Sequence, residues 1–129
     1  MHPNEQVLRQ AYAAMARGDG RQLAAFLDPS ATWHVPGTSP LAGTYTGLNE
    51  IFAFWKRVAE LAPGGLRLEV LDVFANDSRA VVFVVGRGGR KDLTIEERGV
   101  HVFELEGGRA KSARFYYEDQ GAYDRFWSA

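Results

Sequence analysis

Two residues in the last third of the chain, His101 and Asp119, are the strongest candidates for chemistry. His101 falls in an alternating run, on the same face as Ile95, Phe103 and Leu105, so a strand would turn it toward the interior. An imidazole in an apolar pocket can donate, accept or transfer a proton near neutral pH. The alternative is a buried histidine that one neighbour satisfies and that has no catalytic role.

Three carboxylates are candidates to assist His101, and the sequence leaves the choice among them open. Asp119 follows Tyr117 at the end of the last predicted strand, where a carboxylate at a pocket mouth could act as acid or base. It could equally cap the helix that follows. Asp72 interrupts the apolar face of its strand and needs either a partner or a bulge that turns it outward. Glu97 shares a face with His101, although a glutamate near a strand end is commonly solvated.

Aromatic and apolar side chains supply a predicted wall for the pocket. The predicted ligand-contacting residues are Tyr12, Trp33, Val35, Phe52, Trp55 and Tyr117, and Tyr12 adds a hydroxyl. Rings at core spacing usually belong to the core, but an aromatic content of 12% favours an aromatic-lined cavity for a flat ligand. His34 alternates with Trp33 and Val35, so we expect it on the opposite face as a structural or interface residue.

The periodicity of the sequence predicts the elements that position these residues. Apolar spacing of three and four predicts a first helix that Asn4 caps and Gly18 ends, a short helix over 20–27, and a third helix from Thr46 to a stop at Pro63. Strands are predicted over 31–35, 66–75, 79–86, 93–105 and 109–117. The segment 36–45 is predicted to be a loop, and 123–127 a single helical turn.

This order of elements resembles the nuclear transport factor 2-like superfamily. The local match resembles its SnoaL-like branch, which includes polyketide cyclases and lies near ketosteroid isomerase. The segments that carry it are GDGRQLAAFLDPSATWHVPG (18–37), SPLAGTYTGLNEIFAFW (39–55), VHVFELEGGRA (100–110) and YYEDQGAYDRFW (116–127). The resemblance implies an α+β fold: a cone-shaped α+β barrel whose three N-terminal helices pack on a curved mixed or antiparallel sheet, as one domain over 1–129.

The resemblance also carries implications for individual residues. Val35 stands where ketosteroid isomerase has its aspartate base, so the chemistry of that enzyme is not expected here. Tyr12 lies one position from the isomerase's tyrosine, and His101 lies near its oxyanion-hole acid. SnoaL-like cyclases are similar in using a histidine and an aspartate from the late strands, which implies His101 and Asp119.

Composition limits the partners. The chain has 129 residues, no cysteine and a formal net charge of -1, so we expect no disulfide, no thiolate chemistry and no nucleic-acid partner. Arg87, Arg90 and Lys91 gather in a glycine-rich turn as a weak basic patch. No signal peptide and no apolar run of ~20 residues are present, which predicts a cytoplasmic protein without a membrane segment. The two lone histidines offer no metal-site spacing, and neither metal nor cofactor is expected.

The run over 80–85 is apolar on both faces of its strand. An uncovered apolar sheet face usually marks an interface, so the sequence predicts a homodimer through the outer face of the sheet. The alternative is a strand covered on both sides within one protomer.

The function predicted from these features is a cofactor-independent enzyme of isomerase, cyclase or hydrolase type. It would hold a small apolar ligand in the cone and move a proton through His101, helped by a carboxylate. The alternative is a non-catalytic small-molecule-binding or association domain of the same fold, which the absent base at Val35 favours. In a third reading, side chains fill the cone and leave no cavity.

Overall fold

Ten elements follow one another in the computed structural model, which describes residues 2–129. The helices are α1 (Pro3–Ala16), α2 (Gly20–Phe26), α3 (Gly47–Leu61) and α4 (Gln120–Ser128). The strands are β1 (Leu27–Val35), β2 (Gly43–Thr46), β3 (Leu66–Ala75), β4 (Arg79–Arg90), β5 (Leu93–Glu106) and β6 (Arg109–Tyr117). They form one sheet in the order β2-β1-β6-β5-β4-β3. The predicted α+β fold is confirmed with a mixed sheet, because β1 pairs parallel with β6 whereas the other neighbouring strands are antiparallel.

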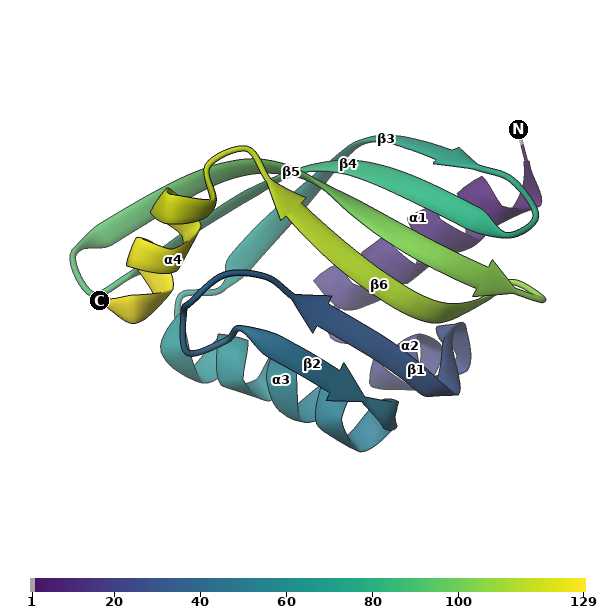
Figure 1. The fold of residues 1–129 in the computed structure, drawn as a ribbon, viewed down its shortest axis with the longest axis horizontal. Coiled ribbons are helices and arrows are strands. Elements are labelled where there is room, and N and C mark those ends of the chain that lie inside the picture. The colour runs from purple at the N-terminus through teal and green to yellow at the C-terminus, as the bar shows by residue number, and fades with distance from the viewer. Residues whose placement is uncertain (1) are drawn as a thin grey trace.

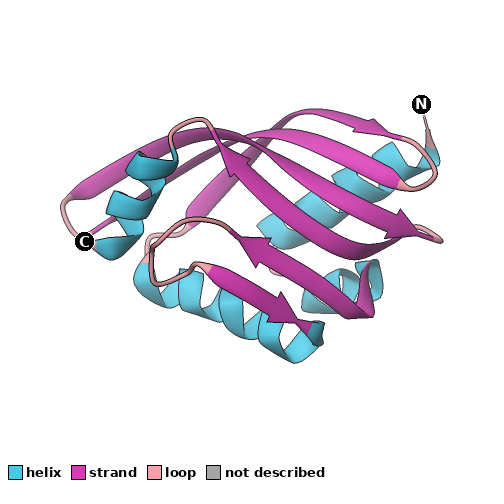
Figure 2. Cartoon of the chain, in the orientation of Figure 1, coloured by secondary structure: helices cyan, strands magenta, loops and turns pink. Residues whose placement is uncertain are grey.

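The sheet curls over the helices without closing into a barrel (Figure 1). Helix α1 runs beneath β3 and β4, and α3 runs beneath β1 and β2, so the two long helices cover the concave face. Helix α4 lies at the end of the cone away from the N-terminus. Figure 2 shows the resulting layers, in which no helix of residues 2–129 lies on the opposite face of the strands.

Alternation along β5 places the interior of the cone where the sequence predicts it. His101, Phe103 and Leu105 are all buried, because every second side chain of a strand points to the same face. On β1, Trp33 and Val35 are buried inside, whereas His34 lies on the outer face. There its ring nitrogens lie 3.1 Å from Thr44 Oγ1 and 3.2 Å from Thr32 Oγ1, in agreement with its predicted orientation.

Several boundaries differ from the prediction. Helix α1 is capped by His2, whose Nδ1 accepts a hydrogen bond from the backbone N–H of Asn4, so Asn4 as the cap was wrong. Strand β1 begins at Leu27, and the predicted loop contains β2, a four-residue strand paired with β1. The sequence of β2, GTYT, has a single large apolar side chain and therefore shows no apolar alternation. The final helix α4 has nine residues, more than the single predicted turn.

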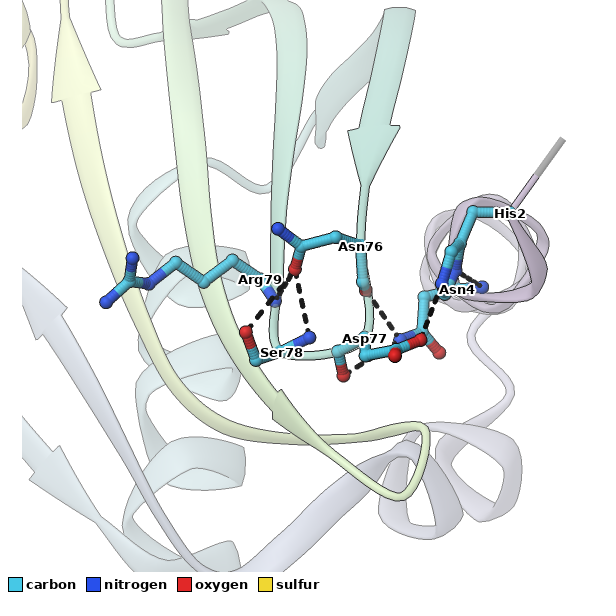
Figure 3. A network of polar contacts seen from close by, with 6 residues as sticks. All are labelled: His2, Asn4, Asn76, Asp77, Ser78 and Arg79. Atoms are coloured by element: carbon cyan, nitrogen blue, oxygen red, sulfur yellow. Dashed lines mark hydrogen bonds and ion pairs between the residues drawn. The ribbon is translucent and has the colours of Figure 1, made fainter.

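A polar network ties α1 to the turn between β3 and β4 at the N-terminal end of the cone (Figure 3). The Nδ2 atom of Asn4 donates to the carbonyl oxygens of Asn76 at 3.0 Å and Asp77 at 3.4 Å. Nε2 of His2 lies 2.8 Å from Oδ1 of Asp77, and Oδ1 of Asn76 accepts from the backbone N–H of Ser78 at 2.9 Å. Asn4 is only 8% exposed, and this network supplies its partners.

The outer face of the sheet is apolar across three strands. Phe83, Val100 and Tyr116 stand side by side on β4, β5 and β6, and the ring of Phe83 meets that of Phe74 edge-on at 5.8 Å. Phe74 is 56% exposed and Tyr116 54%. The apolar character predicted for both faces of β4 is therefore real, and on the outer face Phe83 is 40% exposed in a single chain, whereas Val85 is buried. Within residues 2–129, no helix combines the length and the apolarity needed to cross a membrane.

Candidate functional site

A cavity of about 600 Å³ lies between the concave face of the sheet and helices α1, α3 and α4. A pocket of this size accommodates a small organic ligand. The cone is therefore not filled by its own side chains. Aromatic rings dominate the wall: Trp33, Phe54, Trp55, Phe115, Tyr117, Tyr123 and Trp127.

The structure brings five of the six predicted ligand-contacting residues to this cavity: Tyr12, Trp33, Val35, Trp55 and Tyr117. The sixth, Phe52, is turned away from the lining. Its ring packs edge-on against Trp55 at 5.2 Å and lies beside Gly20 of α2. Phe54 takes the expected place on α3. The sequence could not separate the two phenylalanines, because both stand in one apolar run and either could belong to the buried stripe.

His101 on β5 and Tyr12 on α1 form a hydrogen-bonded side-chain pair in the lining. The Tyr12 hydroxyl lies 2.5 Å from Nδ1 of His101. Burial lowers the pKa of His101 to about 3 and raises the pKa of Tyr12 well above its ordinary value, because a low-dielectric surrounding disfavours each charged form. Both side chains are therefore neutral at physiological pH. The ring of Phe115 meets the imidazole edge-on at 4.7 Å.

Glu97 is the carboxylate that shares the cavity with His101. Its side chain is half-buried, and Oε2 is sealed from solvent without a hydrogen-bond partner among residues 2–129. Burial raises the pKa of Glu97 to about 8. Gly86 on β4 pairs with Glu97 and leaves room for its carboxylate, since a Cβ atom at Gly86 would lie 3.0 Å from Oε1 of Glu97.

Glu97 and His101 address different parts of the cavity. They are four residues apart on one face of β5, and a strand rises about 3.3 Å per residue, so their Cα atoms are separated by roughly 13 Å. A direct hydrogen bond between them is not formed. Near Glu97, the rings of Tyr117 and Tyr123 stack with centroids 4.1 Å apart and 13° between their planes, which gives this part of the wall a flat aromatic surface.

The two other candidate carboxylates lie outside the cavity lining. Asp119 is exposed, and its Oδ1 accepts a hydrogen bond of 2.9 Å from the backbone N–H of Ala122 as the N-cap of α4. Asp72 follows a register shift in β3 that turns its side chain outward, where Oδ1 lies 3.8 Å from Nη2 of Arg9. The sequence was compatible with either a cap or a catalytic group at Asp119, and with either a buried or an outward side chain at Asp72. Which of these forms depends on caps and bulges, and the apolar pattern does not encode them.

Arg90 supports the cavity wall and was missed by the sequence analysis. It is buried, and Nε donates to the carbonyl of Leu61 at 3.0 Å while Nη1 donates to the carbonyls of Phe126 at 3.0 Å and Ala129. It therefore joins the end of α3 to α4. The predicted basic patch was wrong, because Arg90 points inward and Arg87 pairs with carboxylates on the outer surface.

Across the part of the chain that the structure describes, no three histidine, aspartate or glutamate side chains gather as metal ligands would.

The family of the chain follows from its sequence match. Residues 8–113 fit the family model described as a SnoaL-like domain. The chain belongs to this SnoaL-like family. Uncharacterized protein Rv0034 of Mycobacterium tuberculosis is 29% identical over 123 residues, which cover 95% of this chain and 94% of that protein.

Solved structures agree with this assignment. Bal32a, from a soil-derived mobile gene cassette, is 31% identical with a TM-score of 0.91, and the match covers 96% of this chain and 95% of that one. TerC, co-crystallised with polyporic acid, is 23% identical with a TM-score of 0.85, over 98% and 99% of the two chains. The predicted resemblance to SnoaL-like and nuclear transport factor 2-like proteins is confirmed.

Proposed function

We propose that this SnoaL-like protein is a cofactor-independent enzyme that moves a proton on a compact, largely apolar ligand held in the cone. The observation that carries the proposal is Glu97, an unpaired carboxyl in an aromatic cavity. Burial raises its pKa to about 8. General acid–base catalysis is most efficient when the pKa of the catalytic group lies near the working pH. Glu97 therefore takes the role of acid or base that the sequence left open among three carboxylates.

His101 has a second role in this proposal. As a neutral imidazole it is a weak base, so it binds the ligand through a hydrogen bond while Glu97 exchanges the proton. The rings of Trp33, Trp55 and Tyr117 would contact the faces of the ligand. The fold neighbour TerC holds polyporic acid, which supports a small organic molecule as the ligand class.

Hydrogen–deuterium exchange on candidate ligands tests the proposal without knowledge of the biological reaction. The protein is incubated in D₂O with a panel of two- and three-ring compounds that carry an acidic C–H bond, and exchange is followed by NMR. We expect catalysed exchange with the parent protein and a loss of about 100-fold or more in Glu97→Gln, because a positioned acid or base contributes at least this factor. Glu96→Gln is the matched control, since Glu96 is exposed on the same strand and pairs with Arg87.

A non-catalytic binding domain is the second candidate function, and Val35 favours it. This side chain occupies the cavity wall and carries no exchangeable proton. In that case the panel compounds bind with dependence on Trp33 and Trp55, and neither the parent nor Glu97→Gln exchanges deuterium. Exchange that is equally fast in both proteins would remove Glu97 from the mechanism.

We also propose that the protein forms a homodimer through the outer face of the sheet. The contiguous apolar residues Phe83, Val100 and Tyr116 support it, since monomeric proteins rarely expose large apolar patches without a partner. Phe74→Lys is expected to lower the mass measured by sedimentation equilibrium from dimer to monomer. Leu93→Lys, a change at another exposed apolar side chain, serves as the control and should leave the dimer intact.

Two further predictions remain proposals: a single domain over 1–129 and a cytoplasmic location. Packing of α1, α2, α3 and α4 against one sheet supports the first, and the absence of cysteine fits a reducing compartment. Limited proteolysis that releases a stable fragment would contradict the single domain, and cell fractionation tests the location.

A further inference from the structure

The buried hydroxyl of Tyr12 determines how His101 presents itself to a ligand. Tyr12 is neutral because burial raises its pKa well above the ordinary value, so its oxygen carries one proton. Among residues 2–129, the only hydrogen-bond partner of this hydroxyl is Nδ1 of His101, at 2.5 Å. A buried hydroxyl proton without an acceptor would cost about 1–3 kcal/mol. The hydroxyl therefore donates to Nδ1.

This direction of donation leaves one position for the imidazole proton. A neutral imidazole has one N–H and one acceptor nitrogen. With Nδ1 accepting from Tyr12, the proton of His101 resides on Nε2. The hydrogen bond made by one ring nitrogen thus sets the state of the other.

The second nitrogen is the one that faces the cavity. His101 lines the cavity, and Nε2 has no hydrogen-bond partner within residues 2–129. Two side-chain atoms in this part of the chain lack a hydrogen-bond partner and are also sealed from solvent, namely Glu97 Oε2 and Trp127 Nε1. Nε2 of His101 is not one of them, so it is open on one side. Since His101 as a whole is only 6% exposed, the open side of Nε2 is the cavity.

We propose that Tyr12 is a positioning residue that fixes His101 in the Nε2–H tautomer, so that the ligand atom placed against His101 is a hydrogen-bond acceptor such as a carbonyl or phenolic oxygen. This inference rests on the proposed function and names the ligand class of the same cavity. Tyr12 acts through His101, because its own hydroxyl proton is already engaged.

The spacing of the site limits the ligand further. The acceptor oxygen lies at His101, and the exchangeable proton lies at Glu97, with about 13 Å between the two Cα atoms along β5. A ligand that reaches both side chains spans two or three fused or linked rings, and the cavity of about 600 Å³ accommodates such a molecule. The ligand class is therefore a flat ring system with an oxygen acceptor at one end.

Nitrogen-15 NMR of the imidazoles tests the tautomer directly and needs no ligand. His2 and His34 are the other two histidines, and their signals are separated from that of His101 by comparison with His101→Gln. We expect His101 to carry its proton on Nε2 at pH 7 in the parent protein and to become a mixture of tautomers in Tyr12→Phe. A parent protein with the proton on Nδ1 would overturn the proposal, as would a tautomer that is unchanged in Tyr12→Phe.

A pair of shape-matched probes tests the ligand class. The affinities of 2-acetylnaphthalene and 2-isopropenylnaphthalene are measured by calorimetry, and we expect the ketone to bind the parent about tenfold more tightly, as one hydrogen bond of about 1.4 kcal/mol implies. His101→Gln retains an N–H donor and should keep the preference, whereas His101→Leu should abolish it. Equal affinities in the parent, failure of the ketone to bind, or a preference that survives in His101→Leu would each contradict the acceptor assignment.

The inference and the proposed function can fail separately. Loss of deuterium exchange in every protein, with the ketone preference intact, would remove the catalytic role of Glu97 and leave the tautomer assignment standing. Exchange that depends on Glu97, with no preference for the ketone, would support the catalytic role of Glu97 and contradict the acceptor assignment at His101.

Discussion

The two ends of the cone differ in how completely their buried polar groups are paired. At the N-terminal end, the amide of Asn4 donates to two carbonyls of the β3–β4 turn (Figure 3). At the cavity end, Oε2 of Glu97 and Nε1 of Trp127 are buried without a hydrogen-bond partner among residues 2–129. Both ends belong to the same curved sheet (Figure 1), so the difference does not come from the architecture.

This difference indicates where the fold gives up stability. A buried polar atom that loses its hydrogen bond costs about 1–3 kcal/mol, and proteins pair the great majority of such atoms. Departures from that rule concentrate at functional sites, where a binding requirement outweighs the local cost. The fully paired polar groups of the N-terminal end therefore serve the stability of the fold, whereas the unpaired groups of the cavity end are available for chemistry.

The largest expected contrast between the ends comes from removing one ring from each. Phe103 is fully buried, and its ring contacts those of Tyr12, Phe26 and Trp33. We expect Phe103→Ala to lower the free energy of unfolding by about 4 kcal/mol, because a buried ring leaves an enclosed void. Trp55→Ala should cost about 1–2 kcal/mol, since Trp55 is half-buried and already borders the cavity. Urea unfolding followed by circular dichroism measures both.

Phe74→Ala is the control for this pair, because Phe74 is exposed on the outer face of the sheet. Its free energy of unfolding, measured at low protein concentration, should change by less than about 0.5 kcal/mol. Equal losses in Phe103→Ala and Trp55→Ala would mean that the cavity wall stabilises the fold as strongly as the N-terminal core.

The pH dependence of the free energy of unfolding should reflect the ionisation of Glu97 and His101 at the cavity end. Glu97 keeps its proton in the folded chain up to about pH 8, whereas the unfolded chain releases it near 4.5. Its contribution is therefore fully present below about pH 4.5 and is lost as the pH rises through 8. His101 is protonated near 6.5 when unfolded but only near 3 when folded, so its contribution is present above about pH 6.5 and is lost as the pH falls toward 3.

Stability should thus decline toward both acid and alkaline pH, by on the order of 5 kcal/mol on each side, since each pKa unit corresponds to about 1.4 kcal/mol. Thermal unfolding between pH 3 and pH 9 measures the profile. Glu97→Gln should flatten the alkaline side alone, and His101→Gln the acid side alone. An alkaline decline that persists in Glu97→Gln would show that Glu97 ionises freely in the folded chain.

At the N-terminal end, the matching test removes a polar group that is paired. Asn4→Ala deletes two part-buried hydrogen bonds to backbone carbonyls and should lower the free energy of unfolding by about 2 kcal/mol, at about 1 kcal/mol for each bond. Asn49→Ala is the control, since Asn49 is exposed on α3. Ligand affinity should be unchanged in both variants. If Asn4→Ala is as stable as the control, the network does not hold this end of the cone.

The same contrast explains which features could be predicted from the sequence. Helices and strands that carry a long apolar repeat were placed correctly, and alternation alone put His101, Phe103 and Leu105 inside. This information is local, since a side chain's face follows from its position in the repeat. Most of the cavity wall followed in the same way, as Trp33 and Tyr117 illustrate.

The parts that could not be predicted depend on contacts between distant segments. Arg90 is buried because three carbonyls from α3 and the C-terminal end converge on it. Glu97 fits inside because its partner across the sheet is Gly86. A single sequence shows neither the convergence nor the pairing, so the residue type alone suggested surface positions for both.

Substitution of Asp119 is expected to change the free energy of unfolding least, and it separates a structural role of this carboxylate from a catalytic one. It belongs to the cavity end, yet its carboxylate is satisfied as the N-cap of α4, like the paired groups at the opposite end. Asp119→Ala should therefore lower the free energy of unfolding by about 1 kcal/mol, the usual cost of a lost cap, whereas Asp119→Asn keeps a capping oxygen and should stay close to the parent. Deuterium exchange and ligand affinity should be unaffected in both. A drop in exchange in Asp119→Asn, with stability intact, would return the catalytic role to Asp119, because that variant preserves the cap and removes only the ionisable group.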